Sequence, residues 1–151
     1  MPGISHPDRA EQLFREGYNC AQSVAGAFCD TVGQDQAFMT SLASSFGAGF
    51  GRNREVCGAV SAACMVIGLL WGDYPPGDEG KTRHYAVVRD YMDRFKAFKD
   101  TWICRELLNT TVTGGTPEKR TEAYYASRPC IALIRRAAEI LDEMIVERTD
   151  E

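Results

Sequence analysis

Apolar side chains recur every three or four residues along most of the chain, which is the spacing of amphipathic helices. The first such stretch predicts a helix over residues 8–32, and Gly33 after it is a stop signal. The apolar or small residues on its predicted inner face are Leu13, Gly17, Cys20, Val24 and Phe28. The four-residue spacing of phenylalanine and leucine predicts a second helix over residues 35–46.

The longest uncharged stretch covers residues 56–72, which are seventeen residues with many small side chains. A helix that is apolar on all sides is typical of a protein core. A membrane span needs roughly 20 apolar residues as a helix. We therefore interpret this stretch as a buried central helix, and we expect no stable membrane insertion.

The second half of the sequence predicts three more helices, which cover residues 78–98, 101–108 and 129–148. Thr101 is a candidate N-cap, and Pro129 suits a first helical position. Between the last two helices, residues 110–116 are predicted to form a polar loop that contains two consecutive glycines.

Strand-like alternation is absent from the sequence pattern, so the predicted fold class is all-α. A chain of 151 residues fits one domain, because domains cluster at roughly 100–150 residues. We expect a single cysteine-containing helical domain over residues 1–151. Its predicted architecture is a compact bundle of about five to six helices around the central apolar helix at residues 56–72.

A glycine-rich segment at residues 47–53 places three glycines within five positions. This density predicts a turn with unusual backbone angles or a close backbone approach. A dinucleotide fingerprint needs a preceding strand and a G-x-G-x-x-G spacing, and the segment has neither. We therefore interpret it as a structural turn rather than a phosphate cradle.

The composition mainly excludes certain partners and locations for the protein. The formal charge is −4 at pH 7, and nucleic-acid binding rests on clustered Lys and Arg, so we expect no nucleic-acid partner. Residues 1–10 lack the apolar segment of a secretory signal. We expect a cytoplasmic location, where permanent disulfides are rare. The six cysteines are then thiols, metal ligands or a redox pair, or else small core residues.

Three of the cysteines fall near the predicted first turn of a helix, namely Cys57, Cys104 and Cys130. The helix dipole and free N–H groups at such a position stabilise a thiolate. Arg54, Arg105 and Arg128 lie within three residues of these cysteines. Since no two cysteines form a C-x2-C pair, only the fold can bring them together.

The remaining cysteines and the histidines carry weaker signals. Cys29 and Cys64 are surrounded by apolar helix residues, so we predict that they pack in the core. His6 lies in a start segment that we expect to be mobile. His84 is a candidate general base or ligand, although a half-buried helix histidine is the commoner case. No Ser-His-Asp or Cys-His arrangement can be argued from these residues, so the sequence does not define an enzyme active site.

At its cysteines the sequence resembles a bacterial and archaeal family of redox-active proteins known by the pattern C_GCAxxG_C_C. The matching segments are residues 17–23, 45–52, 56–62 and 104–108, followed by a lone Cys130. Ala62 departs from the pattern, which has glycine there, and the extra methyl group bears on local packing more than on chemistry. The resemblance implies that the four family cysteines are Cys20, Cys57, Cys104 and Cys130, and it leaves Cys29 and Cys64 outside.

The leading hypothesis is a thiol-based redox protein in which these four cysteines work as dithiol/disulfide pairs or hold an iron–sulfur cluster or other metal centre, such as zinc. The alternative is a non-catalytic binding or carrier module that delivers metal or sulfur species to a transporter or reductase partner. A third interpretation is a structural helical domain whose cysteines only pack. A redox partner protein or transporter is the expected partner, and the apolar central helix permits a homodimer.

Overall fold

The computed structural model describes residues 3–149, and this part of the chain is all-α, as predicted. Its elements are α1 (His6–Arg15), α2 (Cys20–Ala27), α3 (Cys29–Val32), α4 (Gln36–Ala43), the 3-10 helix η1 (Ser44–Phe46), α5 (Gly47–Phe50), α6 (Gly58–Trp71), α7 (Asp78–Lys99), α8 (Cys104–Leu107), α9 (Glu122–Ser127) and α10 (Cys130–Thr149). Extended pairing in the described residues is limited to one isolated antiparallel bridge between Val56 and Ile103.

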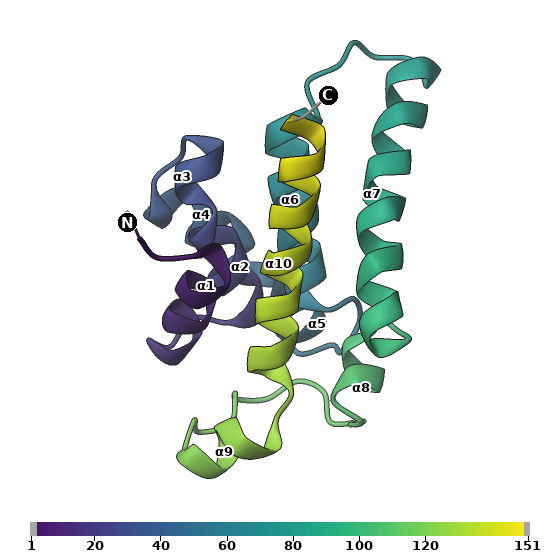
Figure 1. Cartoon of the computed structure of the whole chain (residues 1–151). Coiled ribbons are helices and arrows are strands. Elements are labelled where there is room, and N and C mark those ends of the chain that lie inside the picture. Colours follow the sequence, from purple (N-terminus) through teal and green to yellow (C-terminus); the bar gives the residue numbers. More distant parts are fainter. Residues whose placement is uncertain (1–2, 150–151) are drawn as a thin grey trace.

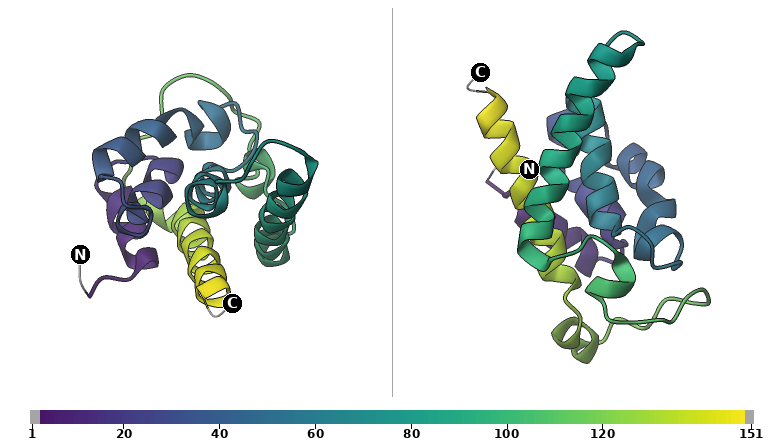
Figure 2. Two further views of the ribbon diagram at one scale, coloured as in Figure 1. Left: turned by 90° about the horizontal axis from the view of Figure 1, so that it is seen from above. Right: turned by 90° about the vertical axis from the view of Figure 1, so that its right-hand side faces the viewer.

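Three long helices, α6, α7 and α10, run side by side, and the helices from α1 to α4 pack against one flank of this group (Figures 1 and 2). Helix α1 lies against α10, and α2 lies against α6. The amino-terminal ends of α6 and α10 both lie at the lower end of the molecule in Figure 1, next to α8. The connectivity therefore brings several helix starts to one end of the bundle.

The predicted continuous helix over residues 8–32 is wrong, because the chain breaks twice in this stretch to give α1, α2 and α3. Gly17 takes a φ of 112° after α1, a conformation that suits glycine. Asn19 then starts α2 with a capping box, in which its side chain accepts from the Gln22 N–H at 2.9 Å and its own N–H donates to the Gln22 side chain at 3.1 Å. Cys20 is consequently the first residue of a helix, and not part of a helix interior.

Helix α6 occupies most of the predicted apolar stretch and contacts α2, α7 and α10. Its burial is one-sided: the buried positions are Gly58, Ala59, Val60, Ala62, Ala63, Val66 and Ile67. Leu69, near the end of the helix, is 45% exposed. No helix among residues 3–149 combines the length and apolar character that crossing a bilayer requires.

The second half follows the prediction with three differences. Ile103, and not Thr101, is the N-cap of α8, while the Thr101 hydroxyl accepts from the Ile103 N–H at 3.1 Å. Helix α10 begins at Cys130, one residue after the predicted start. Helix α9 was not predicted, because its six residues, EAYYAS, are too few to show a helical apolar repeat.

His6 is held in place and does not belong to a mobile segment. Its ring stacks on Phe28 at 4.0 Å between centroids, and its nitrogens lie 2.7 Å from Asp142 Oδ1 and 3.2 Å from Asp30 Oδ1. The hydrogen bond to Asp142 is the main cause that raises the pKa of His6, and Asp30 adds to it against the opposing effect of burial. Protonated His6 therefore links α1 to α10 through Asp142 and to α3 through Asp30.

We expect the stabilising effect of His6 to depend on pH. Because the folded protein binds this proton more tightly than the unfolded chain, the contribution is fully present below the ordinary pKa of 6.5 and is lost as pH rises through the raised value. His6→Gln should therefore lower the free energy of unfolding more at pH 6 than at pH 9 in urea melts. His84→Gln is the control, because it removes an imidazole that has no carboxylate contact among residues 3–149. Equal costs of His6→Gln at both pH values would contradict this assignment.

Candidate functional site

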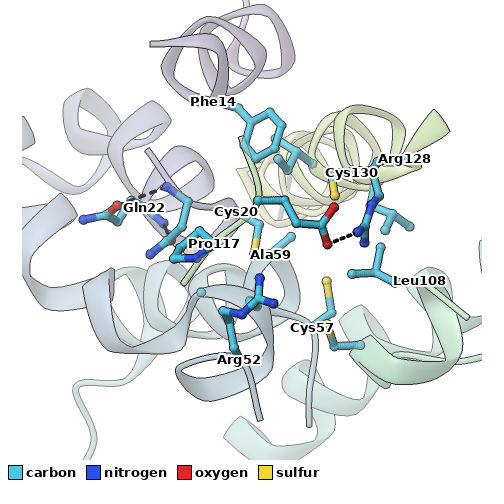
Figure 3. Close-up of a pocket in the computed structure, with 18 of the residues that line it drawn as sticks. Phe14, Cys20, Gln22, Arg52, Cys57, Ala59, Leu108, Pro117, Arg128 and Cys130 are labelled. Atoms are coloured by element: carbon cyan, nitrogen blue, oxygen red, sulfur yellow. Dashed lines mark hydrogen bonds and ion pairs between the residues drawn. The ribbon is translucent and has the colours of Figure 1, made fainter. Parts of the chain in front are cut away.

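One cavity of about 520 Å³ opens where the helix starts converge, and Cys20, Cys57, Cys104 and Cys130 all line it. Figure 3 shows the sulfurs of Cys20, Cys57 and Cys130 around the same space. Cys29 and Cys64 do not line the cavity; they are partly buried and pack against the core. The fold therefore separates the six cysteines into a cavity set of four and a packing pair.

Each of the four cavity cysteines stands at the start of a helix. Cys57 is the N-cap of α6, and Cys20, Cys104 and Cys130 are the first residues of α2, α8 and α10. The prediction for Cys57, Cys104 and Cys130 is confirmed, and Cys20 joins them because of the chain break before α2. Backbone N–H groups that lack a helical partner are concentrated at such positions and favour negative charge.

Two opposing effects act on the pKa of Cys20. Burial has the largest effect and raises the pKa of the thiol, while hydrogen bonding from the backbone of Ala48, Ala21 and Gly58 lowers it. A Cβ on Gly58 would lie only 2.6 Å from Cys20 Sγ, so only glycine lets the start of α6 approach this sulfur so closely.

The glycine-rich segment supplies one wall of the cavity and adopts the unusual backbone angles that its composition predicted. The residues with positive φ are Ala48 (55°), Gly49 (70°), Phe50 (66°), Gly51 (62°), Arg52 (67°) and Arg54 (60°). Such a run of left-handed residues is unfavourable for side chains other than glycine, and backbone strain of this kind gathers at functional sites. Here it places Ala48, Arg52 and Arg54 in the lining of the cavity.

A short backbone ladder holds Cys57 next to Cys104. Around the bridge between Val56 and Ile103, the Cys57 N–H donates to the Trp102 carbonyl at 2.8 Å and the Cys104 N–H donates to the Glu55 carbonyl at 2.6 Å. Side chains alternate along extended backbone, so Cys57 and Cys104 leave the ladder on the same face. Both line the cavity.

Burial raises the pKa of three of the cavity thiols. It raises the pKa of Cys57 strongly and that of Cys130 to about 11, and it also raises the pKa of Cys20. The nearness of Cys104 raises the pKa of each of these three thiols further. A negative charge on Cys104 would therefore discourage ionisation of its neighbours.

The buried guanidinium of Arg54 contacts Cys104. Arg54 is 3% exposed, its Nε donates to the Val112 carbonyl at 2.9 Å, and its Nη1 lies 3.8 Å from Cys104 Sγ. The sequence placed Arg54 beside Cys57, but the left-handed backbone sends its side chain to Cys104 instead. Arg105, the neighbour of Cys104 in sequence, pairs with Glu55 at 2.7 Å.

Several cavity residues lie outside the cysteine motifs, and sequence reasoning missed them. Arg120 and Glu118 come from the long connection before α9, and Glu118 forms an ion pair with Arg128 (Figure 3). No periodicity or spacing marks these residues in the sequence. His84, the other candidate ligand, lines a separate small cavity beside Tyr74, so the fold does not bring it to the cysteines.

The metal-ligating residue types that line the cavity are its four cysteines and Glu118. Among residues 3–149, no group of three or more His, Cys, Asp or Glu side chains is arranged to hold a metal ion. All six cysteines are free thiols.

These features define an all-α protein with a thiol-lined cavity built from helix starts. Residues 18–144 match the model of the family described as putative redox-active protein (C_GCAxxG_C_C), and the chain belongs to this family. No curated protein and no solved structure matches the chain. The matched residues include all six cysteines.

Proposed function

We propose that this protein is a thiol–disulfide redox protein whose reactive group is the cavity set Cys20, Cys57, Cys104 and Cys130. The observation that carries the proposal is that all four thiols line the same cavity, with the buried cation of Arg54 at Cys104. A thiolate beside a cation is the form that attacks disulfides. Three protonated neighbours then provide the second thiol that completes the exchange.

The proposed reaction begins with the Cys104 thiolate. It attacks one sulfur of an incoming disulfide, the S–S bond of that molecule breaks, and one half leaves as a thiolate that takes up a proton. A second cavity thiol loses its proton and attacks the Cys104 sulfur, which forms a protein disulfide and releases the other half as a thiol. The incoming disulfide gains two electrons, and the protein dithiol is oxidised by two electrons.

Several further assignments belong to this proposal. We place the protein in the cytoplasm, because dithiols are kept reduced there, and we expect a redox partner protein to reduce it again. The carrier alternative, in which the cavity delivers metal or sulfur species to a transporter, predicts binding without disulfide formation. A homodimer is compatible with the proposal, which needs only the residues of one chain.

The proposal predicts that thiols are lost in pairs on oxidation. Reduced protein equilibrated in redox buffers with an increasing proportion of disulfide should fall from six titratable thiols to four, and further losses should also come in twos. Maleimide labelling of the denatured protein, followed by mass spectrometry, counts the remaining thiols. The Cys29→Ala/Cys64→Ala double variant is the control, and it should keep every oxidation step.

Two results would overturn the proposal. The first is loss of single thiols, which indicates unpaired oxidation of exposed cysteines. The second is the isolation of anaerobically purified protein with stoichiometric iron or zinc that is lost when the four cavity cysteines are replaced with serine. That result would assign the cysteines to a metal centre instead.

A further inference from the structure

The cavity wall is strongly basic, although the protein as a whole is acidic. Four arginines line the cavity, namely Arg52, Arg54, Arg120 and Arg128. The one carboxylate among the lining residues is that of Glu118, which pairs with Arg128. The formal charge of the whole chain is −4, so this concentration of positive charge is local to the site.

The other three guanidinium groups have no carboxylate partner within ion-pair distance among residues 3–149. Backbone carbonyls hold them instead. Arg52 Nε donates to the Gly114 carbonyl at 2.8 Å, Arg54 Nε donates to the Val112 carbonyl at 2.9 Å, and Arg120 Nη2 donates to the Tyr18 carbonyl at 2.7 Å. Neutral carbonyls fix the position of these side chains without neutralising their charge.

These bonds position guanidinium groups around the thiols. The connection before α9 holds Arg52 and Arg54 by Nε, which leaves terminal nitrogens for other contacts. Figure 3 shows the Arg52 side chain pointing into the space that Cys20, Cys57 and Cys130 surround. Both terminal nitrogens of Arg120 donate to backbone carbonyls, those of Phe14 and Tyr18, and its guanidinium lies over the Phe14 ring, 3.9 Å from the centroid. A guanidinium fork matches a carboxylate in geometry and charge.

We infer that the cavity binds a small disulfide that carries carboxylate groups, that Arg52 is its carboxylate-binding residue, and that Arg120 adds positive charge to the same cavity. The inference rests on the proposed function and names its substrate class. The cavity volume of about 520 Å³ falls within the range of small-molecule sites, roughly 300–1,000 Å³. A negatively charged substrate would also supply a counter-charge for Arg52, Arg54 and Arg120. Of these, Arg54 is buried, and unpaired buried charge is unfavourable.

Three alkyl disulfides of similar size and different charge test this inference. They are 3,3′-dithiodipropionate (anionic), 2-hydroxyethyl disulfide (neutral) and cystamine (cationic). Stopped-flow oxidation of the reduced protein is measured with each, and each rate is divided by the rate of free cysteine with the same disulfide. We expect the corrected rate with dithiodipropionate to exceed that with the neutral disulfide about tenfold or more, and cystamine to be slowest. Added salt should reduce the difference.

Variants locate the preference. Arg52→Gln should lower the ratio of the anionic to the neutral rate about tenfold, and Arg120→Gln, which removes charge but no free fork, should lower it by less. Arg89→Gln, which removes an exposed arginine of α7, is the matched control and should leave the ratio unchanged. A ratio that does not respond to Arg52→Gln and Arg120→Gln would overturn the assignment of these residues.

A binding measurement separates this inference from the proposed function. Calorimetric titration of dithiodipropionate into a variant with all four cavity cysteines changed to serine requires no redox chemistry. Binding of dithiodipropionate but not of 2-hydroxyethyl disulfide supports the anion site, even if the thiols prove inert. Equal rates with all three disulfides, together with no binding to the serine variant, would overturn the anion site and leave the proposed function standing.

Discussion

Replacing Cys104 with serine is expected to slow the reduction of small disulfides by this protein at least about 100-fold. A serine hydroxyl is not ionised at neutral pH, and burial raises the pKa of the remaining cavity thiols, that of Cys130 to about 11. No other cavity thiol among the described residues contacts a buried guanidinium as Cys104 contacts Arg54. The rate is measured by the release of thiol from 2-hydroxyethyl disulfide under single-turnover conditions.

Two further variants show whether the loss is specific to this thiol. Cys64→Ser removes a thiol outside the cavity and should leave the rate unchanged. Arg54→Gln keeps an N–H donor at the Cys104 sulfur but removes the charge, and we expect a loss of about tenfold. A Cys104→Ser protein that reacts as fast as the unmodified protein would show that another cavity thiol makes the first attack.

Replacing Gly49 with alanine is expected to destabilise the protein by about 3 kcal/mol. Gly49 has a φ of 70°, and a Cβ there would lie 2.5 Å from the backbone nitrogen of Glu55. The substitution therefore adds a clash with fixed backbone to the cost of the left-handed conformation. Urea denaturation followed by circular dichroism gives the change in the free energy of unfolding.

Gly51 offers a matched control in the same segment. It also has a positive φ, of 62°, but a Cβ at this position would meet no atom within 4 Å. Gly51→Ala should therefore show only the backbone cost, about 1 kcal/mol. Equal costs at the two positions would mean that the close approach of Gly49 to residues 54–55 does not constrain the fold.

The sequence predicted the fold class and most long helices because their signal is local. Apolar periodicity and end signals such as Gly33, which caps α3 with a φ of 72°, define a helix without reference to the rest of the chain. The continuous helix at residues 8–32 failed because an apolar repeat persists across the break. The break is set by Gly17 and by the capping pair of Asn19 and Gln22. These three residues do not interrupt the apolar repeat, so the hydrophobic pattern alone does not reveal the break.

The thiol residues of the site were predictable, because cysteines are recognisable from their type and spacing in the sequence. The four cysteines that the family resemblance singled out all line the cavity, whereas the glycine-rich segment, interpreted only as a structural turn, also forms part of its lining. The charge of the cavity was not predictable, because Arg120 comes from an irregular connection and Arg54 reaches Cys104 only through left-handed backbone. Adjacency in sequence was also a poor guide to ion pairing. Arg105 follows Cys104 directly, but its side chain pairs with Glu55.

The most direct test of a reactive four-thiol cavity is a disulfide map of the mildly oxidised protein. Reduced protein is oxidised with one equivalent of 2-hydroxyethyl disulfide, free thiols are blocked at low pH, and the digest is analysed by mass spectrometry without reduction. We predict a disulfide that joins two of the four cysteines on the cavity wall, with Cys29 and Cys64 recovered as blocked thiols. A bond that includes Cys29 or Cys64, or four cavity cysteines that stay reduced, would contradict this prediction.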